Sequence, residues 1–127
     1  MPLKVFISSG RGVHKWNDAF VPSVRQAFDR WSAATLGVLR FSEAAEEAEA
    51  DIVVIWDDGA KDFGHSGHAG PDKTDEGGWI RHARVTLHTQ LPKMHCDVTP
   101  DTVLETAQHE IGHALGLLGH SDRLAFA

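Results

Sequence analysis

The sequence TPDTVLETAQHEIGHALGLLGH, which runs from Thr99 to His120, decides how the fold is interpreted. Thr99 followed by Pro100 is typical of a helix N-cap and a first helical position, so the stretch predicts a helix that begins near Pro100. Apolar residues then recur at helical spacing and form one stripe: Val103, Leu104, Ala107, Ile111, Ala114 and Leu115. Gly116 is expected to end the helix in a left-handed turn, which glycine adopts without steric penalty.

The predicted helix carries the motif H-E-x-x-H at residues 109–113. His109 and His113 are four residues apart, which places both imidazoles on one helix face and aims them at one point. A catalytic zinc ion takes three protein ligands and keeps one position open for water, so a third ligand is expected nearby, and His120 is the candidate. Gly116 would allow the chain to turn back toward the metal, and Glu110 is left facing the open position.

A plainer interpretation is that His109 and His113 belong to the polar face of an ordinary helix. That interpretation leaves the spacing of Gly116 and His120 unexplained. The nine histidines among 127 residues are also several times the ordinary usage of this residue, which favours metal chemistry. We therefore prefer the zinc interpretation.

The rest of the chain predicts an α+β arrangement around this helix. Four segments have the composition or alternation of strands: 3–8, 38–41, 51–56 and 80–88. The continuous apolar run 51–56 is expected to be a central strand that is covered on both faces. Residues 18–34 have apolar side chains at helical spacing and predict an amphipathic helix that Gly37 ends. Two polar stretches, 57–78 and 90–98, are expected to be loops.

Composition limits the classes of function. At 127 residues the chain is expected to form one compact domain, 1–127, and no apolar run approaches the roughly 20 residues needed to cross a bilayer. Acidic residues outnumber basic ones by 18 to 12, which argues against a nucleic-acid surface. Cys96 is the only cysteine, so metal ligands must come from His, Asp or Glu. The N-terminus lacks the pattern of a signal peptide.

Residues 109–116, HEIGHALG, followed by a later histidine, resemble the signature of the metzincin metallopeptidases and are closest to the matrixins. The segments 28–32, FDRWS, and 50–52, ADI, are also similar to that family, and the resemblance spans most of residues 3–122. It implies a zincin-like α+β fold, namely a twisted mixed sheet with one antiparallel edge strand, a backing helix and an active-site helix. It also implies a secreted zinc endopeptidase that acts on peptide or protein substrates, with Glu110 as general base.

Two departures from the matrixin pattern change these expectations. His120 stands eleven residues after His109, whereas the common spacing is ten, a position that Gly119 occupies here. The run Gly119-His120-Ser121 resembles a variant of bacterial matrixin-like sequences, so His120 is kept as the third ligand. No methionine follows Met94, so the Met-containing turn and final helix of the family are expected to be missing. The alternative function is therefore a catalytically impaired zinc-binding fragment or interaction module, which could self-associate through its exposed base.

The long loop 57–78 is a candidate for a second zinc or a calcium ion, because matrixins often carry structural metals there. The candidate ligands are Asp62, His65, His68 and Asp72, while Arg84 stands where matrixins place another histidine. The histidines outside these sets are expected to be surface or loop residues: His14, His82, His88 and His95. Residues 80–88 are expected to be an edge strand with which an extended substrate peptide pairs by backbone hydrogen bonds.

Overall fold

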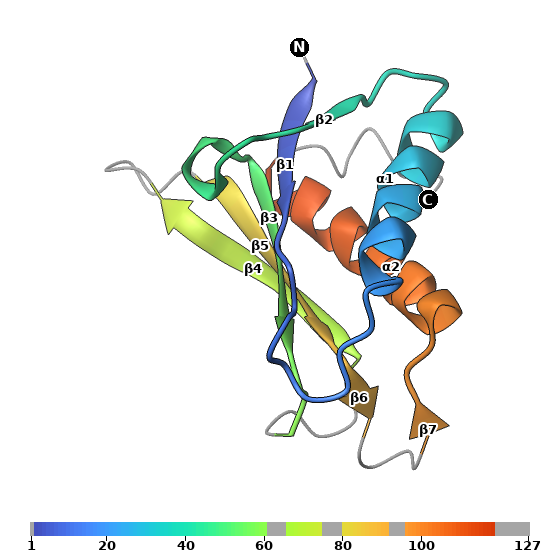
Figure 1. The fold of residues 1–127 in the computed structure, drawn as a ribbon. Helices are drawn as coiled ribbons and strands as arrows, with labels where there is room; N and C mark the ends of the chain where they lie inside the picture. Colours follow the sequence, from blue (N-terminus) through green and yellow to red (C-terminus); the bar gives the residue numbers. More distant parts are fainter. Residues whose placement is uncertain (1, 61–65, 75–79, 92–95, 119–127) are drawn as a thin grey trace.

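The structure is a computed structural model that describes residues 2–60, 66–74, 80–91 and 96–118, without the side chains at 72–74, 80–81 and 96–97. Its main sheet has five strands, in the order β2-β1-β3-β5-β4 (Figure 1). Their bounds are β1 Leu3–Ile7, β2 Phe41–Glu43, β3 Ile52–Asp57, β4 Gly67–Thr74 and β5 Ile80–His88. β2, β1, β3 and β5 pair in parallel, and β4 pairs antiparallel with β5. The sheet is thus mixed with one antiparallel edge strand, as expected.

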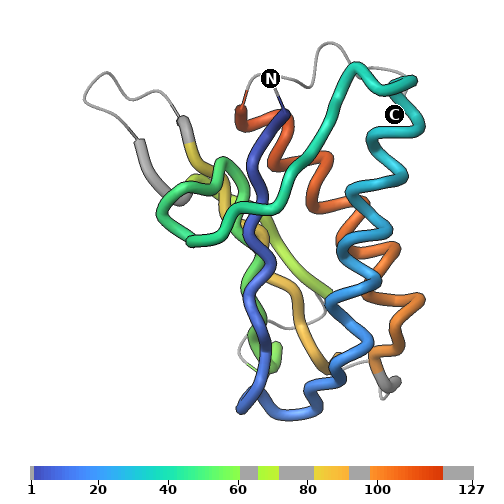
Figure 2. The backbone as a smooth tube through the Cα atoms, turned by 45° about the horizontal axis from the view of Figure 1, so that its top comes forward, coloured from blue at the N-terminus to red at the C-terminus, as the bar shows by residue number. Residues whose placement is uncertain are grey.

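In the described residues two α-helices, α1 at Phe20–Ala34 and α2 at Pro100–Leu117, accompany the sheet. Figures 1 and 2 both show them on the same side of the sheet, with α2 beside α1. The short elements are the 3-10 helix η1 at Glu47–Glu49 and the two-residue strands β6, Gln90–Leu91, and β7, Cys96–Asp97. None of the helices in the described residues combines the length and apolar character needed to cross a membrane.

The predicted central strand is confirmed. β3 lies between β1 and β5, and the consecutive residues Ile52, Val53 and Val54 are all at most 1% exposed. Because neighbouring side chains of a strand point to opposite faces, both faces of β3 are covered here. The apolar run of the sequence is therefore unbroken because both faces of the strand are buried, as predicted.

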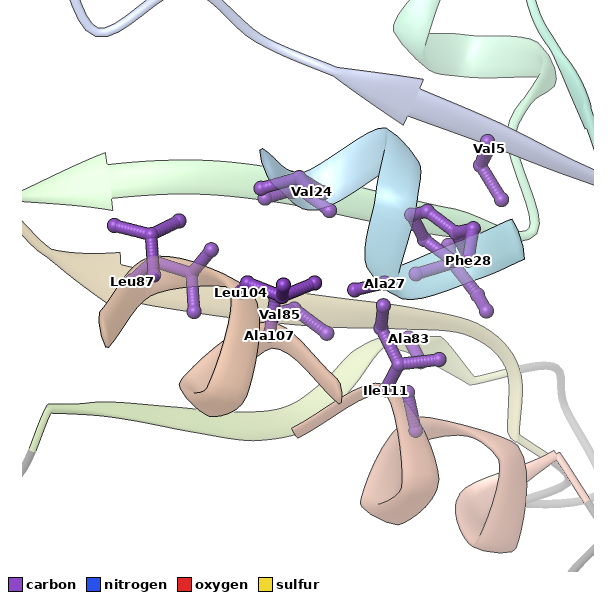
Figure 3. Close-up of a cluster of buried hydrophobic side chains, with 14 of the residues drawn as sticks. Val5, Val24, Ala27, Phe28, Ala83, Val85, Leu87, Leu104, Ala107 and Ile111 are labelled. Atoms are coloured by element: carbon purple, nitrogen blue, oxygen red, sulfur yellow. The ribbon is translucent and has the colours of Figure 1, made fainter. Parts of the chain in front are cut away.

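The core lies between the sheet and the two helices (Figure 3). Helix α1 contributes Val24, Ala27 and Phe28 to it, which follow the helical spacing of the sequence. Its end also agrees with the prediction, because Gly37 has a φ of 81° and its N–H donates to the carbonyl of Ser32. Helix α2 buries every residue of its predicted stripe: Val103, Leu104, Ala107, Ile111, Ala114 and Leu115.

The prediction that residues 80–88 form an edge strand is wrong. β5 is an interior strand, since β3 pairs on one side of it and β4 on the other. The edge is β4, at Gly67–Thr74, inside the stretch predicted to be a loop. Its sequence, GHAGPDKT, looks like a loop because glycine and proline disfavour strand interiors, but an edge strand tolerates both. A register shift between Pro71 and Lys73 interrupts the pairing with β5.

Two further boundaries differ from prediction. The strand expected at 38–41 is β2 at Phe41–Glu43. Helix α2 does not end at Gly116 in a left-handed turn, because it continues to Leu117 and the N–H of Leu118 still donates to the carbonyl of Ala114. Leu118 packs against the core, so the apolar stripe extends the helix past the glycine.

Candidate metal centre

Helix α2 begins where the sequence places a cap. The N–H of Thr102 donates to the Thr99 hydroxyl at 3.2 Å, and Pro100 takes the first helical position. The cap satisfies one of the otherwise unpaired N–H groups of the first turn, and Asp101 complements the positive end of the helix dipole. The cap and the buried stripe together fix the rotation of α2, and so decide which residues of the motif face solvent.

His109 and His113 lie side by side on the exposed face of α2. Their Nε2 atoms are 3.0 Å apart, and the two rings meet edge to face with centroids 4.6 Å apart. Two nitrogen ligands at about 2.0–2.1 Å from a tetrahedral zinc ion would lie roughly 3.4 Å from each other. The observed pair thus differs from a zinc-binding geometry by only a few tenths of an ångström. The two imidazoles fit a shared zinc ion.

Glu110, between them in the sequence, is a largely buried residue of α2, at 9% exposure, whereas both histidines are exposed. The same face of the helix carries Ala107, Ile111 and Ala114. The expected orientation of the Glu110 carboxylate toward the open zinc position stays a prediction.

The start of strand β4 lies close to this side of α2. Thr106, one turn before Glu110, donates from its hydroxyl to the Ser66 hydroxyl at 2.9 Å. A Cβ atom added to Gly67 would lie 3.1 Å from the Thr106 methyl and 2.7 Å from the carbonyl oxygen of Thr86. Glycine at position 67 is therefore required for β4 to approach the helix this closely. The exposed sheet edge and the motif helix are direct neighbours.

The third predicted ligand, His120, lies outside the described residues, so its role stays a prediction. Within residues 2–60, 66–74, 80–91 and 96–118, no three His, Cys, Asp or Glu side chains come close enough to hold a metal ion together. The described part of the chain thus contains two members of the predicted zinc site and the predicted base.

The proposed second metal site in 57–78 also stays a prediction. Asp62 and His65 lie outside the described residues, as does the side chain of Asp72. His68 is exposed on β4, and its ring lies 6.0 Å from that of His88.

The expectation for the other histidines holds in part. His14 is exposed, as predicted, and His95 lies outside the described residues. His88 contradicts the prediction: it is an interior strand residue, 2% exposed, with Nε2 3.9 Å from a carboxylate oxygen of Asp57. His82 is half-buried in β5, and its Nδ1 lies 2.7 Å from the carbonyl oxygen of Ala50. The prediction of surface positions failed because both residues lie on β5, which was expected at the edge of the sheet but is an interior strand.

The comparison with known families agrees with this geometry. The sequence profile of the matrixin family matches residues 12–125. The match covers both helices, all strands from β2 onward and the H-E-x-x-H motif. No curated protein matches the sequence.

Proposed function

The chain belongs to the matrixin family of zinc metallopeptidases, and from this premise we propose that it is an endopeptidase whose zinc ligands are His109, His113 and His120. The observation that carries the proposal is the 3.0 Å separation of the His109 and His113 Nε2 atoms on the exposed face of α2. His120 is proposed as the third ligand on its sequence position alone. Zinc, when bound, supplies Lewis-acid chemistry that polarises a substrate carbonyl and lowers the pKa of a water molecule.

Glu110 is proposed as the general base. Its carboxylate accepts a proton from the attacking water and then donates it to the nitrogen of the leaving amine. The position of Glu110 in the motif supports this role, since it follows one zinc ligand directly and lies on the buried side of α2.

The substrate is proposed to pair with the edge of β4. In the described residues this strand pairs only with β5, so its other edge can accept the backbone of an extended peptide. The contact between Gly67 and Thr106 supports the proposal, because it brings the start of that edge within one helical turn of Glu110. This replaces the strand at 80–88 that the sequence suggested.

The test combines zinc content with proteolysis. Elemental analysis should find about one zinc per wild-type chain, and a fluorescently labelled unfolded protein should be cleaved. Glu110→Ala should keep the zinc and lose roughly 10²–10⁴-fold in cleavage rate. Glu105→Ala is the matched control, because Glu105 is an exposed residue of the same helix and its loss should leave cleavage unchanged.

Each outcome has a distinct meaning. A wild-type chain without zinc would refute the ligand assignment. Zinc without cleavage would favour the catalytically impaired zinc-binding form, and full activity in Glu110→Ala would refute the base assignment. Size-exclusion chromatography would test self-association, which stays a prediction.

A further inference from the structure

The two helices meet at Trp31, on α1, directly beside the H-E-x-x-H motif. The indole Nε1–H of Trp31 donates to the backbone carbonyl of Gln108 at 2.8 Å. A Cβ atom added to Gly112 would lie 2.9 Å from Cζ2 of the same ring, closer than carbon atoms normally approach. Trp31 thus contacts the residue before His109 and the residue before His113.

The hydrogen bond acts on the helix backbone itself. In an α-helix the carbonyl of Gln108 pairs with the N–H of Gly112, so Trp31 adds a second donor to an oxygen that is already fixed in the helical ladder. A backbone acceptor cannot rotate away as a side chain does. The bond therefore restrains both the rotation of α2 and its position along its axis.

A second polar contact at this junction is weaker. Arg30 donates from Nη1 to the side-chain oxygen of Gln108 at 3.3 Å, and both partners are long side chains at the surface. Water competes for both groups, and ordering them costs conformational entropy. Trp31 is half-buried and packs against the core. Of these two polar contacts, the one from Trp31 therefore restrains α2 more strongly.

The two imidazoles depend on the backbone for their direction. Zinc-binding histidines usually donate their second ring nitrogen to a carboxylate or carbonyl that orients the ring. In the described part of the chain, the hydrogen bond recorded for His109 and His113 is the one between their own Nε2 atoms. Where the backbone of α2 lies therefore decides where the two nitrogens point.

We propose that Trp31 is a positioning residue of the zinc site: it holds the backbone of α2 at Gln108 and Gly112, and thereby fixes the place and direction in which the helix presents His109 and His113 to one ion. The inference rests on the proposed function, since it requires zinc at this pair. Zinc–ligand distances lie within about 0.2 Å of their standard values, and the groups that orient the ligands affect metal affinity, so a displacement of the helix is expected to change both affinity and coordination geometry.

The experiment compares two tryptophans. Trp31→Phe removes the indole donor and keeps an aromatic ring, while site-specific replacement of Trp31 by 3-benzothienylalanine keeps the indole shape and removes only the N–H. Trp56→Phe is the matched control, because Trp56 also donates from Nε1 to a backbone carbonyl at 2.8 Å, that of Ser8, and packs against Trp16 and Phe20. The readouts are the zinc dissociation constant, from competition with a chelator, and the visible absorption spectrum of the cobalt-substituted protein.

Both Trp31 variants should bind zinc about 10- to 100-fold more weakly and shift the cobalt bands, as loss of an orienting partner does in other zinc sites. Trp56→Phe should leave both readouts at wild-type values even if it lowers thermal stability. Wild-type zinc affinity and spectrum in the benzothienylalanine variant would overturn the inference while the proposed function stands. A wild-type chain that binds neither zinc nor cobalt would overturn both the inference and the proposed function. If Trp31→Phe and Trp56→Phe weakened zinc binding equally, the effect would come from a general loss of stability, and the inference would be overturned.

Discussion

Replacement of Gly112 by alanine should destabilise the protein, although the same change in an ordinary helix interior stabilises it. Alanine is favoured over glycine by about 1 kcal/mol at such a position. Here the new methyl group would lie 2.9 Å from Cζ2 and 3.5 Å from Cη2 of Trp31. Carbon atoms prefer separations of about 3.5–4.0 Å, so the ring has to move by about 0.6–1 Å.

The ring cannot move without further cost. Its Nε1 is held at 2.8 Å from the Gln108 carbonyl, and loss of that bond costs about 1 kcal/mol. Overpacking typically costs about 1–3 kcal/mol. With the lost hydrogen bond added and the propensity gain subtracted, Gly112→Ala should lower the free energy of unfolding by about 1–3 kcal/mol. For a chain of this length that corresponds to a drop of about 4–11 °C in Tm.

The assay is urea unfolding followed by tryptophan fluorescence, with EDTA present so that zinc binding does not contribute to stability. The control is a double-mutant cycle with Trp31→Phe, since phenylalanine lacks the two ring atoms that the methyl group meets. In the phenylalanine background Gly112→Ala should be neutral or stabilising, which gives a coupling of at least about 1 kcal/mol. An alanine variant as stable as wild type, or more stable, would refute the steric argument.

Two further predictions concern α2. Ile111→Ala should lower the free energy of unfolding by about 2–5 kcal/mol, because Ile111 is fully buried in the core. Elemental analysis should still find the wild-type zinc content. A loss of stability below about 1 kcal/mol would contradict the packing. Thr99→Ala should cost about 1 kcal/mol through loss of the cap to Thr102, and Thr99→Ser, which keeps the hydroxyl, should restore most of it in the same urea assay. Equal stability of the alanine and serine variants would show that the cap contributes nothing.

The sequence by itself determined the features that depend on local spacing. Helix α2, its cap at Thr99, its buried stripe and the convergence of His109 and His113 all follow from the period of one helix. The covered strand β3 follows in the same way from an unbroken apolar run. These predictions succeeded because the partners are at most a few residues apart along one regular element.

The tertiary structure decided the features that depend on which distant segments meet. The polar stretch 67–74 became the edge strand, and this made β5 an interior strand with a buried His88. Pairing with β5 supplies the hydrogen bonds of β4, so strand propensity, which is low for its glycines and proline, did not decide its conformation. The contact of Trp31 with Gln108 joins residues 77 positions apart. No local sequence pattern encodes such a contact. It forms only when both helices pack on the same sheet, because that packing brings the indole of Trp31 to the backbone beside His109.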